Sequence, residues 1–451
     1  MERFDVFVIG GGGTGSSVVI RLANAGLKVA MAERDRLGGE CTTYGCVPSK
    51  ALLKAARVAS VGRRSQAFGI DIPEVRVDFP AVMARVNGII EEMLSAGTRP
   101  FEEAGVTVYL QEARIFGDRR IELADGTEIE AAKIVVATGS HPTAPPIEGL
   151  RDGFWTHREA THLEALPSSV AILGAGPVGV EFAQIFSRFG VDTTLIEARD
   201  RALPGEDRDA SEALAPVLEA EGVRVLVGAE VERVERPGGR WRLAIARGGP
   251  IDADALLVAT AQEPVFDAHD LDAVGVSLGE DGKPVLSETL RSTNSDIWIA
   301  GDATGDHLFV HVNDHEADVV IDDILGTPHA VDYRIVPHVT FCQPEVAGVG
   351  LTEEEAQQAG HEVMVGVTRF EDDERAQIEG EQWGLVKLVA DARNGELLGG
   401  HIVGEHAGEL LAEVIAAMAG RIEPGSVGSA IHPFPTRSQS VQGAFRALEG
   451  V

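Results

Sequence analysis

The order of apolar and polar positions repeats in two parts of the chain. Residues 6–33 and 170–197 each begin with an apolar run, which predicts a strand, and continue through a glycine-rich turn into a predicted helix. A second apolar run closes each copy, at 28–32 and at 192–196, and an acidic residue follows it. The pattern predicts two strand-helix-strand units that contribute to parallel sheets.

The glycines of the two turns have the spacing Gly-x-Gly-x-x-Gly. They are Gly10, Gly12 and Gly15 in the first copy and Gly174, Gly176 and Gly179 in the second. The first glycine bends the turn, the second lets backbone amides approach a pyrophosphate, and the third packs the helix on the strand. Glu33 and Glu197 follow the first glycine by 23 residues and can accept hydrogen bonds from ribose hydroxyls. One hexapeptide could be a plain tight turn in a chain with 52 glycines, but two matching copies predict two dinucleotide sites.

Further apolar runs and breaks organise the rest of the chain. Runs at 134–140, 256–261 and 297–304 predict buried strands. Asp302 lies in the last of them, where it can bind a cofactor hydroxyl or cap the helix that follows. A proline-rich stretch at 141–146 marks a domain crossing.

We expect three domains. A first dinucleotide-binding domain takes residues 1–145 and 264–330, and a second takes residues 146–263. The last segment, 331–451, alternates apolar strands with an amphipathic helix at 408–419 and has no glycine fingerprint. We expect this segment to serve substrate binding or dimerisation.

Length and charge narrow the class of protein. The 451 residues, 44% of them hydrophobic, suffice for two to four domains with cores of their own. Lysine and arginine number 39 against 71 acidic residues, and the net charge of −32 argues against nucleic acid and anionic lipid as partners. No run of about 18 apolar residues occurs and the chain starts with a strand-like run, so we expect no membrane span and no signal peptide. We expect a cytoplasmic protein, since three cysteines are too few for a secreted disulfide scaffold.

Two of the cysteines, Cys41 and Cys46, are separated by four residues and follow the first strand-helix-strand copy. This spacing can bring two sulfurs within disulfide reach, and the turn can bring a cofactor to the same place. Pro48 suits the first turn of a helix, which would put Cys46 at a helix N-terminus, where a thiolate is stabilised. The pair indicates a redox enzyme that passes electrons between a cofactor and two cysteines. A structural disulfide and a zinc half-site are the alternatives, but zinc needs about four ligands and no second pair is near, so we predict no metal site.

The cysteines belong to a longer motif, Gly-Gly-x-Cys-x4-Cys-Val-Pro-Ser-Lys, over 38–50. With the two glycine fingerprints, Ala-Thr-Gly at 137–139, Gly-Asp at 301–302 and Gln-Pro-Glu-Val-Ala-x-Val-Gly at 343–350, it resembles the class I pyridine nucleotide-disulfide oxidoreductases. That family includes dihydrolipoamide dehydrogenase, glutathione reductase and mercuric reductase. The resemblance implies two doubly wound, Rossmann-like α/β domains plus a C-terminal α/β dimerisation domain, and a homodimer. It implies FAD in the first site and NAD(H), with NADP(H) possible, in the second.

The resemblance also implies roles for single residues. Gly39, Thr138, Gly139 and Asp302 would bind FAD together with the first fingerprint and its acid. Cys46 would lie against the flavin, and Cys41 would exchange with substrate.

Lys50 resembles the family lysine beside the flavin N5 atom, and Glu181 stands where its partner belongs. Two unrelated surface charges are the alternative. In the second site the carboxylate of Glu197 favours NADH over NADPH. Arg199 and Arg201 lie nearby and can either bind a 2′-phosphate or belong to a solvated loop.

The C-terminal segment departs from the family. Family disulfide reductases end in His-Pro-Thr-x-x-Glu, which supplies a base to the partner subunit's site. Here the Pro-Thr at 435–436 places Phe434 at the histidine and Gln439 at the glutamate, and neither replaces the lost proton transfer. His432 is the alternative base. Residues 260–265 also lack the family's Gly-Arg-x-Pro-Asn, and the solitary Cys342 is expected to be a buried inert thiol and not a third redox centre.

These features predict an FAD-dependent NAD(P)H oxidoreductase with a redox-active Cys41–Cys46 disulfide. The missing base favours a metal ion, a quinone or an activated disulfide as acceptor. A true dihydrolipoamide dehydrogenase or mercuric reductase is the first alternative. A redox-sensing flavoprotein without turnover is the second, although the intact cysteines, Lys50 and Glu181 argue against it.

Overall fold

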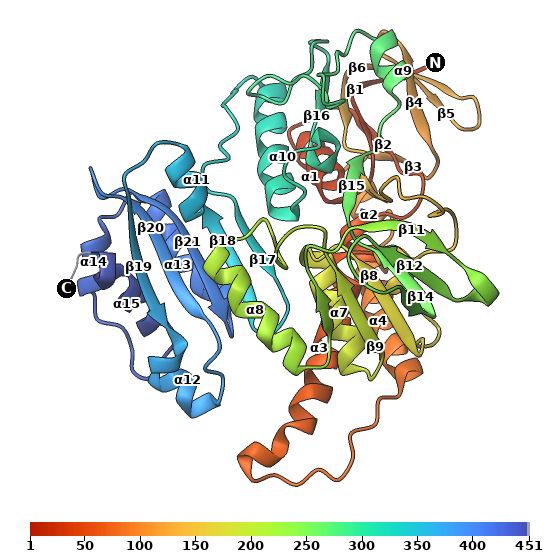
Figure 1. Ribbon diagram of the computed structural model, residues 1–451. Helices are drawn as coiled ribbons and strands as arrows, with labels where there is room; N and C mark the ends of the chain where they lie inside the picture. Colours follow the sequence, from red (N-terminus) through yellow and green to blue (C-terminus); the bar gives the residue numbers. More distant parts are fainter. Residues whose placement is uncertain (449–451) are drawn as a thin grey trace. The chain divides into compact units, whose positions relative to one another are not determined.

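The computed structural model describes residues 1–448, which form two compact units (Figure 1). Unit 1 contains Met1–Ser49, Met83–Thr143 and Ala261–Asp332, and unit 2 contains Lys50–Val82, Ala144–Thr260 and the chain from Tyr333 onward. The chain passes from unit 1 to unit 2 inside the expected proline-rich crossing. The division into three domains stays a prediction, since nearly all of the last two predicted domains falls in unit 2.

Unit 1 is built on a seven-stranded sheet with the order β3-β2-β1-β6-β5-β4 and with β16 paired to β6. Its strands are β1 (Glu2–Ile9), β2 (Val29–Ala32), β3 (Thr107–Tyr109), β4 (Ala113–Gly117), β5 (Arg120–Leu123), β6 (Glu128–Val136) and β16 (Ile297–Ile299). The pairs β1–β2, β2–β3, β1–β6 and β6–β16 are parallel, whereas β4–β5 and β5–β6 are antiparallel. A separate ribbon pairs β7 (Ser140–Thr143) with β15 (Ala261–Pro264).

Helices α1 (Gly13–Asn24) and α10 (Val310–Leu325) cover one face of this sheet (Figure 1). Val18 of α1 and Ile321 of α10 are buried there against the strands. On the other face Phe7 packs with Ile121. Because β1 is buried on both faces, its sequence is a nearly continuous apolar run and not an alternating one.

Unit 2 contains three sheets. A parallel sheet has the order β10-β9-β8-β14, an antiparallel one the order β11-β12-β13, and a second antiparallel one the order β17-β18-β21-β20-β19. The strands are β8 (Ser169–Leu173), β9 (Asp192–Ile196), β10 (Arg224–Leu226), β11 (Val231–Glu235), β12 (Trp241–Ile245), β13 (Ile251–Ala253), β14 (Ala255–Val258), β17 (Pro337–Thr340), β18 (Glu345–Gly350), β19 (Val363–Arg369), β20 (Leu385–Asp391) and β21 (Leu397–Gly404).

The other α-helices of the described residues are short apart from six. They are α2 (Gly39–Thr43), α3 (Cys46–Arg63), α4 (Phe79–Leu94), α5 (Arg99–Glu103), α6 (His157–Ala160), α7 (Pro177–Arg188), α8 (Arg208–Ala220), α9 (Ala268–Ala273), α11 (Glu353–Gln358), α12 (Glu374–Glu379), α13 (Ala407–Ala419), α14 (Pro424–Ser429) and α15 (Ser438–Leu448). The predicted helix at 408–419 is α13 with one residue added, and the predicted strand at 192–196 is β9. None of the helices within residues 1–448 has the length and apolar character that a membrane span requires.

The five-stranded sheet has one apolar and one charged face. Helices α13 and α15 pack on the apolar face. On the opposite face His338, His401 and Lys387 form one row across β17, β21 and β20. Lys387 Nζ lies 3.0 Å from the Asp207 carboxylate, and His338 Nε2 lies 2.9 Å from that of Glu206. Burial lowers the pKa of His338, but the hydrogen bond and charge of Glu206 outweigh it and raise the pKa; in His401 burial prevails and lowers the pKa. These pairs hold the segment before α8 on the sheet.

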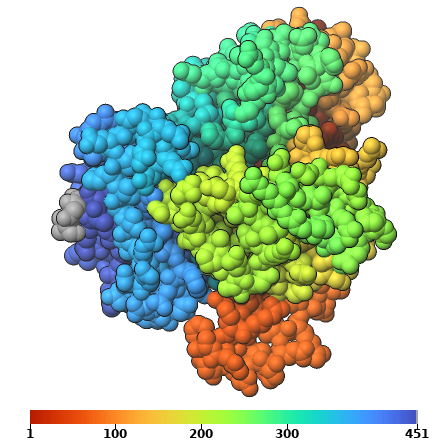
Figure 2. Space-filling view, viewed as in Figure 1, coloured from red at the N-terminus to blue at the C-terminus, as the bar shows by residue number. Residues whose placement is uncertain are grey.

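The segment between α3 and α4 projects from the rest of unit 2 (Figures 1 and 2). It exposes the apolar side chains of Phe68, Ile70 and Ile72. Phe68 is 60% exposed.

Candidate functional site

The first glycine turn has room for glycine alone at two of its positions. Gly10 has a φ of +113°, and a Cβ there would lie 2.1 Å from the carbonyl oxygen of Ala137. A Cβ at Gly15 would lie 2.0 Å from the carbonyl oxygen of Gly10. At Gly12 the nearest atom is 3.8 Å away, so the backbone of the middle position stays open to a ligand.

The second turn has the same geometry. Gly174 has a φ of +100°, and its Cβ would lie 2.6 Å from the carbonyl oxygen of Ala259. A Cβ at Gly179 would meet the carbonyl oxygen of Gly174 at 1.9 Å, whereas nothing lies within 4 Å of the Cβ position of Gly176. Both turns therefore present a backbone cradle that a side chain at the middle glycine would fill.

The acid that ends each copy braces its own turn. Glu33 accepts hydrogen bonds from the amides of Gly11 and Asp35, both at 2.7 Å. Glu197 makes the same two bonds, to the second residue of its turn at 2.8 Å and to the amide of Arg199 at 2.9 Å. The sequence suggested a ribose contact, and the structure adds this bracing, which fixes the direction of each carboxylate.

The two arginines near Glu197 differ in freedom. Arg201 donates to the carbonyl oxygens of Pro204 at 3.2 Å and of Glu206 at 3.4 Å, so its guanidinium is committed to its own loop. Arg199 is exposed. Of the two, only Arg199 keeps the exposure that a 2′-phosphate contact requires.

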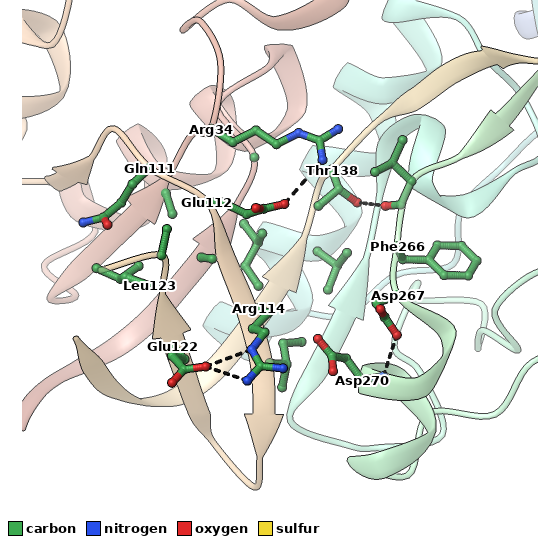
Figure 3. A pocket seen from close by; sticks show the side chains of 18 of the residues that line it. Arg34, Gln111, Glu112, Arg114, Glu122, Leu123, Thr138, Phe266, Asp267 and Asp270 are labelled. Carbon is green, nitrogen blue, oxygen red and sulfur yellow. Dashed lines mark hydrogen bonds and ion pairs between the residues drawn. The ribbon is translucent and has the colours of Figure 1, made fainter. Parts of the chain in front are cut away.

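A cavity of about 680 Å³ opens beside the first turn in unit 1 (Figure 3). Gly10, Glu33 and Thr138 line it, and the Thr138 hydroxyl donates to the carbonyl oxygen of Val265. Gly139 follows with a φ of +77°, a left-handed conformation that glycine adopts readily. The volume is in the range of sites for small molecules and cofactors.

Charged side chains line part of this cavity. Figure 3 shows Arg114 and Glu122 paired, with 2.7 Å between nitrogen and oxygen, and Asp267 capping the helix that carries Asp270. Burial, then the charge of Asp267, raises the pKa of Asp270.

Asp302 is held in a chain of side-chain hydrogen bonds. Its carboxylate lies 2.8 Å from the Ser140 hydroxyl and accepts from the Asn313 amide at 2.9 Å. Ser140 also lies 3.0 Å from Gln262, in the segment where the chain departs from the family pattern. The alternative of a helix cap is wrong, because α10 begins eight residues later, at Val310.

The cysteine loop packs directly on the first turn. Gly39 has a φ of +62°, and a Cβ there would lie 2.8 Å from the Cα of Gly12. Cys41 lies in α2, and Cys46 is the first residue of the 18-residue helix α3, as predicted. This contact between two glycines brings the cysteine segment to the dinucleotide cradle.

Two buried polar atoms beside these elements test whether FAD fits. Thr43 Oγ1 in α2 and Asn313 Oδ1 in α10 are buried and have no hydrogen-bond partner among the described residues. Such atoms are costly unless a ligand or water meets them. With the cavity and the open middle glycine, they fit a long ligand rich in hydrogen-bonding groups, as FAD is.

Lys50 and Glu181 come together in unit 2, although 131 residues separate them. Lys50 Nζ lies 2.9 Å from Glu181 Oε2, and the Glu181 side chain is only 5% exposed. The other carboxylate oxygen accepts the amide of Phe341 at 2.9 Å. A buried carboxylate charge is tolerated when its oxygens have partners, and both oxygens of Glu181 do.

In the C-terminal segment, the two candidate positions for the base differ in exposure. Phe434 is 68% exposed, whereas His432 is nearly buried. His432 Nε2 lies 2.7 Å from Glu413 and its Nδ1 lies 3.2 Å from the carbonyl oxygen of Ala430. Gln439 lies in the first turn of α15.

Cys342 is buried, as predicted. Its thiol donates to the carbonyl oxygen of Pro344 at 3.1 Å. Burial raises the pKa of this thiol well above its usual range, and the charge of Glu181 adds to the effect. A thiol held in this neutral state has little tendency to react.

Sequence reasoning missed Ser140, Asn313, Thr43 and Phe341. Ser140 directly follows the Ala-Thr-Gly motif, so its position was a usable signal. The other three are brought to the site by tertiary packing alone.

Comparisons with known proteins agree with this arrangement. The profile of the family described as pyridine nucleotide-disulphide oxidoreductase matches residues 4–321, and that of its dimerisation domain matches residues 336–445. Dihydrolipoyl dehydrogenase of Bacillus subtilis is 32% identical over 99% of this chain and 98% of that protein. Mercuric reductase of Bacillus cereus is 32% identical over 97% of this chain and 70% of that protein.

Solved structures are similar over the same extent. The Cu(II) complex of the HOCl-induced flavoprotein disulfide reductase RclA from Escherichia coli has a TM-score of 0.89 and 27% identity, covering 99% of both chains. LpdA from Mycobacterium tuberculosis has a TM-score of 0.88 and 25% identity. The expected α/β fold class and the expected dimerisation domain are thereby confirmed. The chain belongs to the pyridine nucleotide-disulphide oxidoreductase family, FAD-dependent enzymes that use NAD(P)H and act on sulfur groups.

Proposed function

We propose that this protein takes electrons from NADH and passes them through its Cys41–Cys46 pair to an acceptor that needs no histidine base. The packing of Gly39 on Gly12 carries the proposal, because it joins the cysteine segment to the first dinucleotide cradle. We also propose a cytoplasmic homodimer with the three domains expected from the sequence.

In this proposal the residues of the chain have separate roles in electron transfer. When bound, FAD would supply the two-electron chemistry that links NADH to the disulfide: NADH gives a hydride, solvent gives a proton, and the disulfide becomes two thiols. Cys46, at the N-terminus of α3, is held where the helix dipole stabilises a thiolate. Cys41 exchanges with the acceptor, and Lys50, fixed by Glu181, supplies a positive charge one helical turn after Cys46.

The geometry of His432 supports the loss of the family base. Its two ring nitrogens face a carboxylate and a carbonyl oxygen, and both of these groups accept hydrogen bonds. Both ring nitrogens are therefore engaged by neighbouring groups of unit 2. When Pro-Thr at 435–436 is matched with the family's Pro-Thr, the exposed Phe434 stands at the position of the base.

A reaction panel tests the proposal. We expect NADH to bleach the flavin rapidly, with lipoamide turned over slowly and a quinone, Hg(II) or Cu(II) turned over faster. Cu(II) is included because the similar RclA was solved as a Cu(II) complex. Rapid lipoamide turnover would favour a true dihydrolipoamide dehydrogenase, and no turnover with any acceptor would favour a redox sensor.

Restoring the base should create lipoamide activity. We expect the double substitution Phe434→His and Gln439→Glu to raise disulfide reductase activity about 10-fold or more, short of the full 10²–10⁴-fold worth of a general base, because neighbouring packing is not adapted. Steady-state assays with lipoamide would measure it. Phe434→His alone is the matched control and should gain less, since an unoriented imidazole samples unproductive tautomers. If His432→Ala removed wild-type activity instead, His432 would be the base.

Glu197 should set the choice of nucleotide. We expect a higher kcat/KM for NADH than for NADPH, and Glu197→Ala should narrow the gap by about 1–3 kcal/mol through loss of hydrogen bonds and of repulsion toward a 2′-phosphate. Arg199→Ala is the control, and it should leave the NADH value nearly unchanged. A wild type that prefers NADPH would transfer the selecting role to Arg199.

A further inference from the structure

Phe341 has no part in the function proposed above, yet it contacts both members of the Lys50–Glu181 pair. Its amide donates to Glu181 Oε1 at 2.9 Å, and its ring centroid lies 5.0 Å from Lys50 Nζ. An ammonium within about 6 Å of an aromatic centroid is attracted by the ring. The ammonium of Lys50 therefore has a carboxylate and an aromatic ring as neighbours.

The loop that carries Phe341 is fixed on α7. Gln184 accepts the amide of Gln343 and donates to its carbonyl oxygen, both at 2.7 Å. Gln184 and Glu181 lie one turn apart on α7, so the same helix face holds the loop at two points. Residues 342–344 are buried, whereas the Phe341 side chain is 44% exposed. A fixed backbone thus presents one aromatic side chain to Lys50.

Lys50 needs this support more than Glu181 does. Its side chain is 38% exposed and carries four rotatable bonds, and one ion pair at such a site leaves a lysine mobile. A second contact from the ring restricts the ammonium further.

We infer that Phe341 is a positioning residue for Lys50. Its amide orients the carboxylate, and its ring keeps the ammonium in one place. The inference rests on the proposed function, together with the family resemblance by which Lys50 would lie beside the flavin. A fixed positive charge there favours the reduced flavin, so loss of the ring should lower the flavin reduction potential.

Two measurements on Phe341→Leu test the inference. The first is the rate at which an amine-reactive acetylating reagent labels Lys50 in the purified protein, followed by peptide mass spectrometry. We expect labelling to be about 2- to 5-fold faster, because the ring no longer covers the ammonium. The second is the flavin midpoint potential, which should fall by about 10–20 mV, the same fold-change for a two-electron couple.

The controls separate positioning from general damage. Phe341→Tyr keeps an aromatic face and should behave as wild type. Phe68→Leu makes the same substitution at another exposed phenylalanine and should change neither value. Phe341→Met fills a similar volume without a ring, and it replaces the leucine variant if that variant melts early.

A Lys50→Met background gives the decisive comparison. If Phe341 acts through Lys50, adding Phe341→Leu to Lys50→Met should leave the potential where Lys50→Met alone puts it. Two results would overturn the inference. One is that Phe341→Leu lowers the flavin potential as much in the Lys50→Met background as in the wild type. The other is unchanged Lys50 labelling in Phe341→Leu. Labelling does not depend on flavin, so a wild type without FAD would refute the proposed function while the contact itself could still be measured.

Discussion

Replacing Cys46 with serine will abolish disulfide reduction while NADH still reduces the flavin. We expect a loss of about 10³-fold or more, because the proposed electron path runs through a Cys41–Cys46 disulfide and a serine hydroxyl at position 46 cannot complete that disulfide. The substitution should also remove the long-wavelength absorption band that a thiolate gives beside an oxidised flavin. Stopped-flow spectra during NADH reduction and a steady-state assay with an activated disulfide measure the two effects.

Cys41→Ser is the informative partner of this variant. It leaves Cys46 without a disulfide partner at the N-terminus of α3, so the band should be present before any reductant is added. Cys342→Ser makes the same change at a buried thiol and should keep both band and activity. If Cys46→Ser shows the band and Cys41→Ser lacks it, the roles of the two sulfurs are reversed.

Alanine substitutions in the two glycine turns should weaken the two cofactor sites independently of each other. Gly15→Ala places a Cβ 2.0 Å from a backbone oxygen, and Gly179→Ala does the same at 1.9 Å. Since overpacking typically costs 1–3 kcal/mol, we expect about 10- to 100-fold weaker binding of FAD in the first variant and of NADH in the second. FAD content on purification and NADH-dependent flavin reduction provide the measurements.

The chain offers controls within the same turns. Gly13 has no atom within 4 Å of its Cβ position and an ordinary φ, so Gly13→Ala should fold and keep FAD. Gly176→Ala should fold as well as the wild type, because its Cβ meets no protein atom, but should still lose NADH. Normal NADH binding by Gly176→Ala would show that no ligand backbone contact is made at this turn.

Much of the fold was predictable because it is local. The two turns require glycine at the first and third positions for reasons of backbone geometry, and the strands beside them are apolar because both faces of the sheet are covered. The helix that begins at Cys46 follows from the proline two residues later. Bounds such as those of β9 agree with the prediction because the periodicity there is unbroken.

The resemblance to a family supplied what local patterns do not contain. Lys50 and Glu181 lie 131 residues apart, and no periodicity joins them. Their pairing depends on two helices meeting, so the sequence alone left two surface charges as an alternative. The alternative interpretation of Asp302, as a helix cap, was wrong for a related reason, because an apolar run does not show where the next helix begins.

What the sequence by itself determined are the two glycine turns and the close cysteine pair, since each depends on neighbouring residues only. Tertiary structure alone decided that Gly39 packs on Gly12 and that Phe341 faces Lys50. It also decided that His432 is occupied by acceptors on both sides of its ring. These contacts join segments distant in the chain, and their geometry follows from how the helices and sheets of each unit pack together and not from any local pattern.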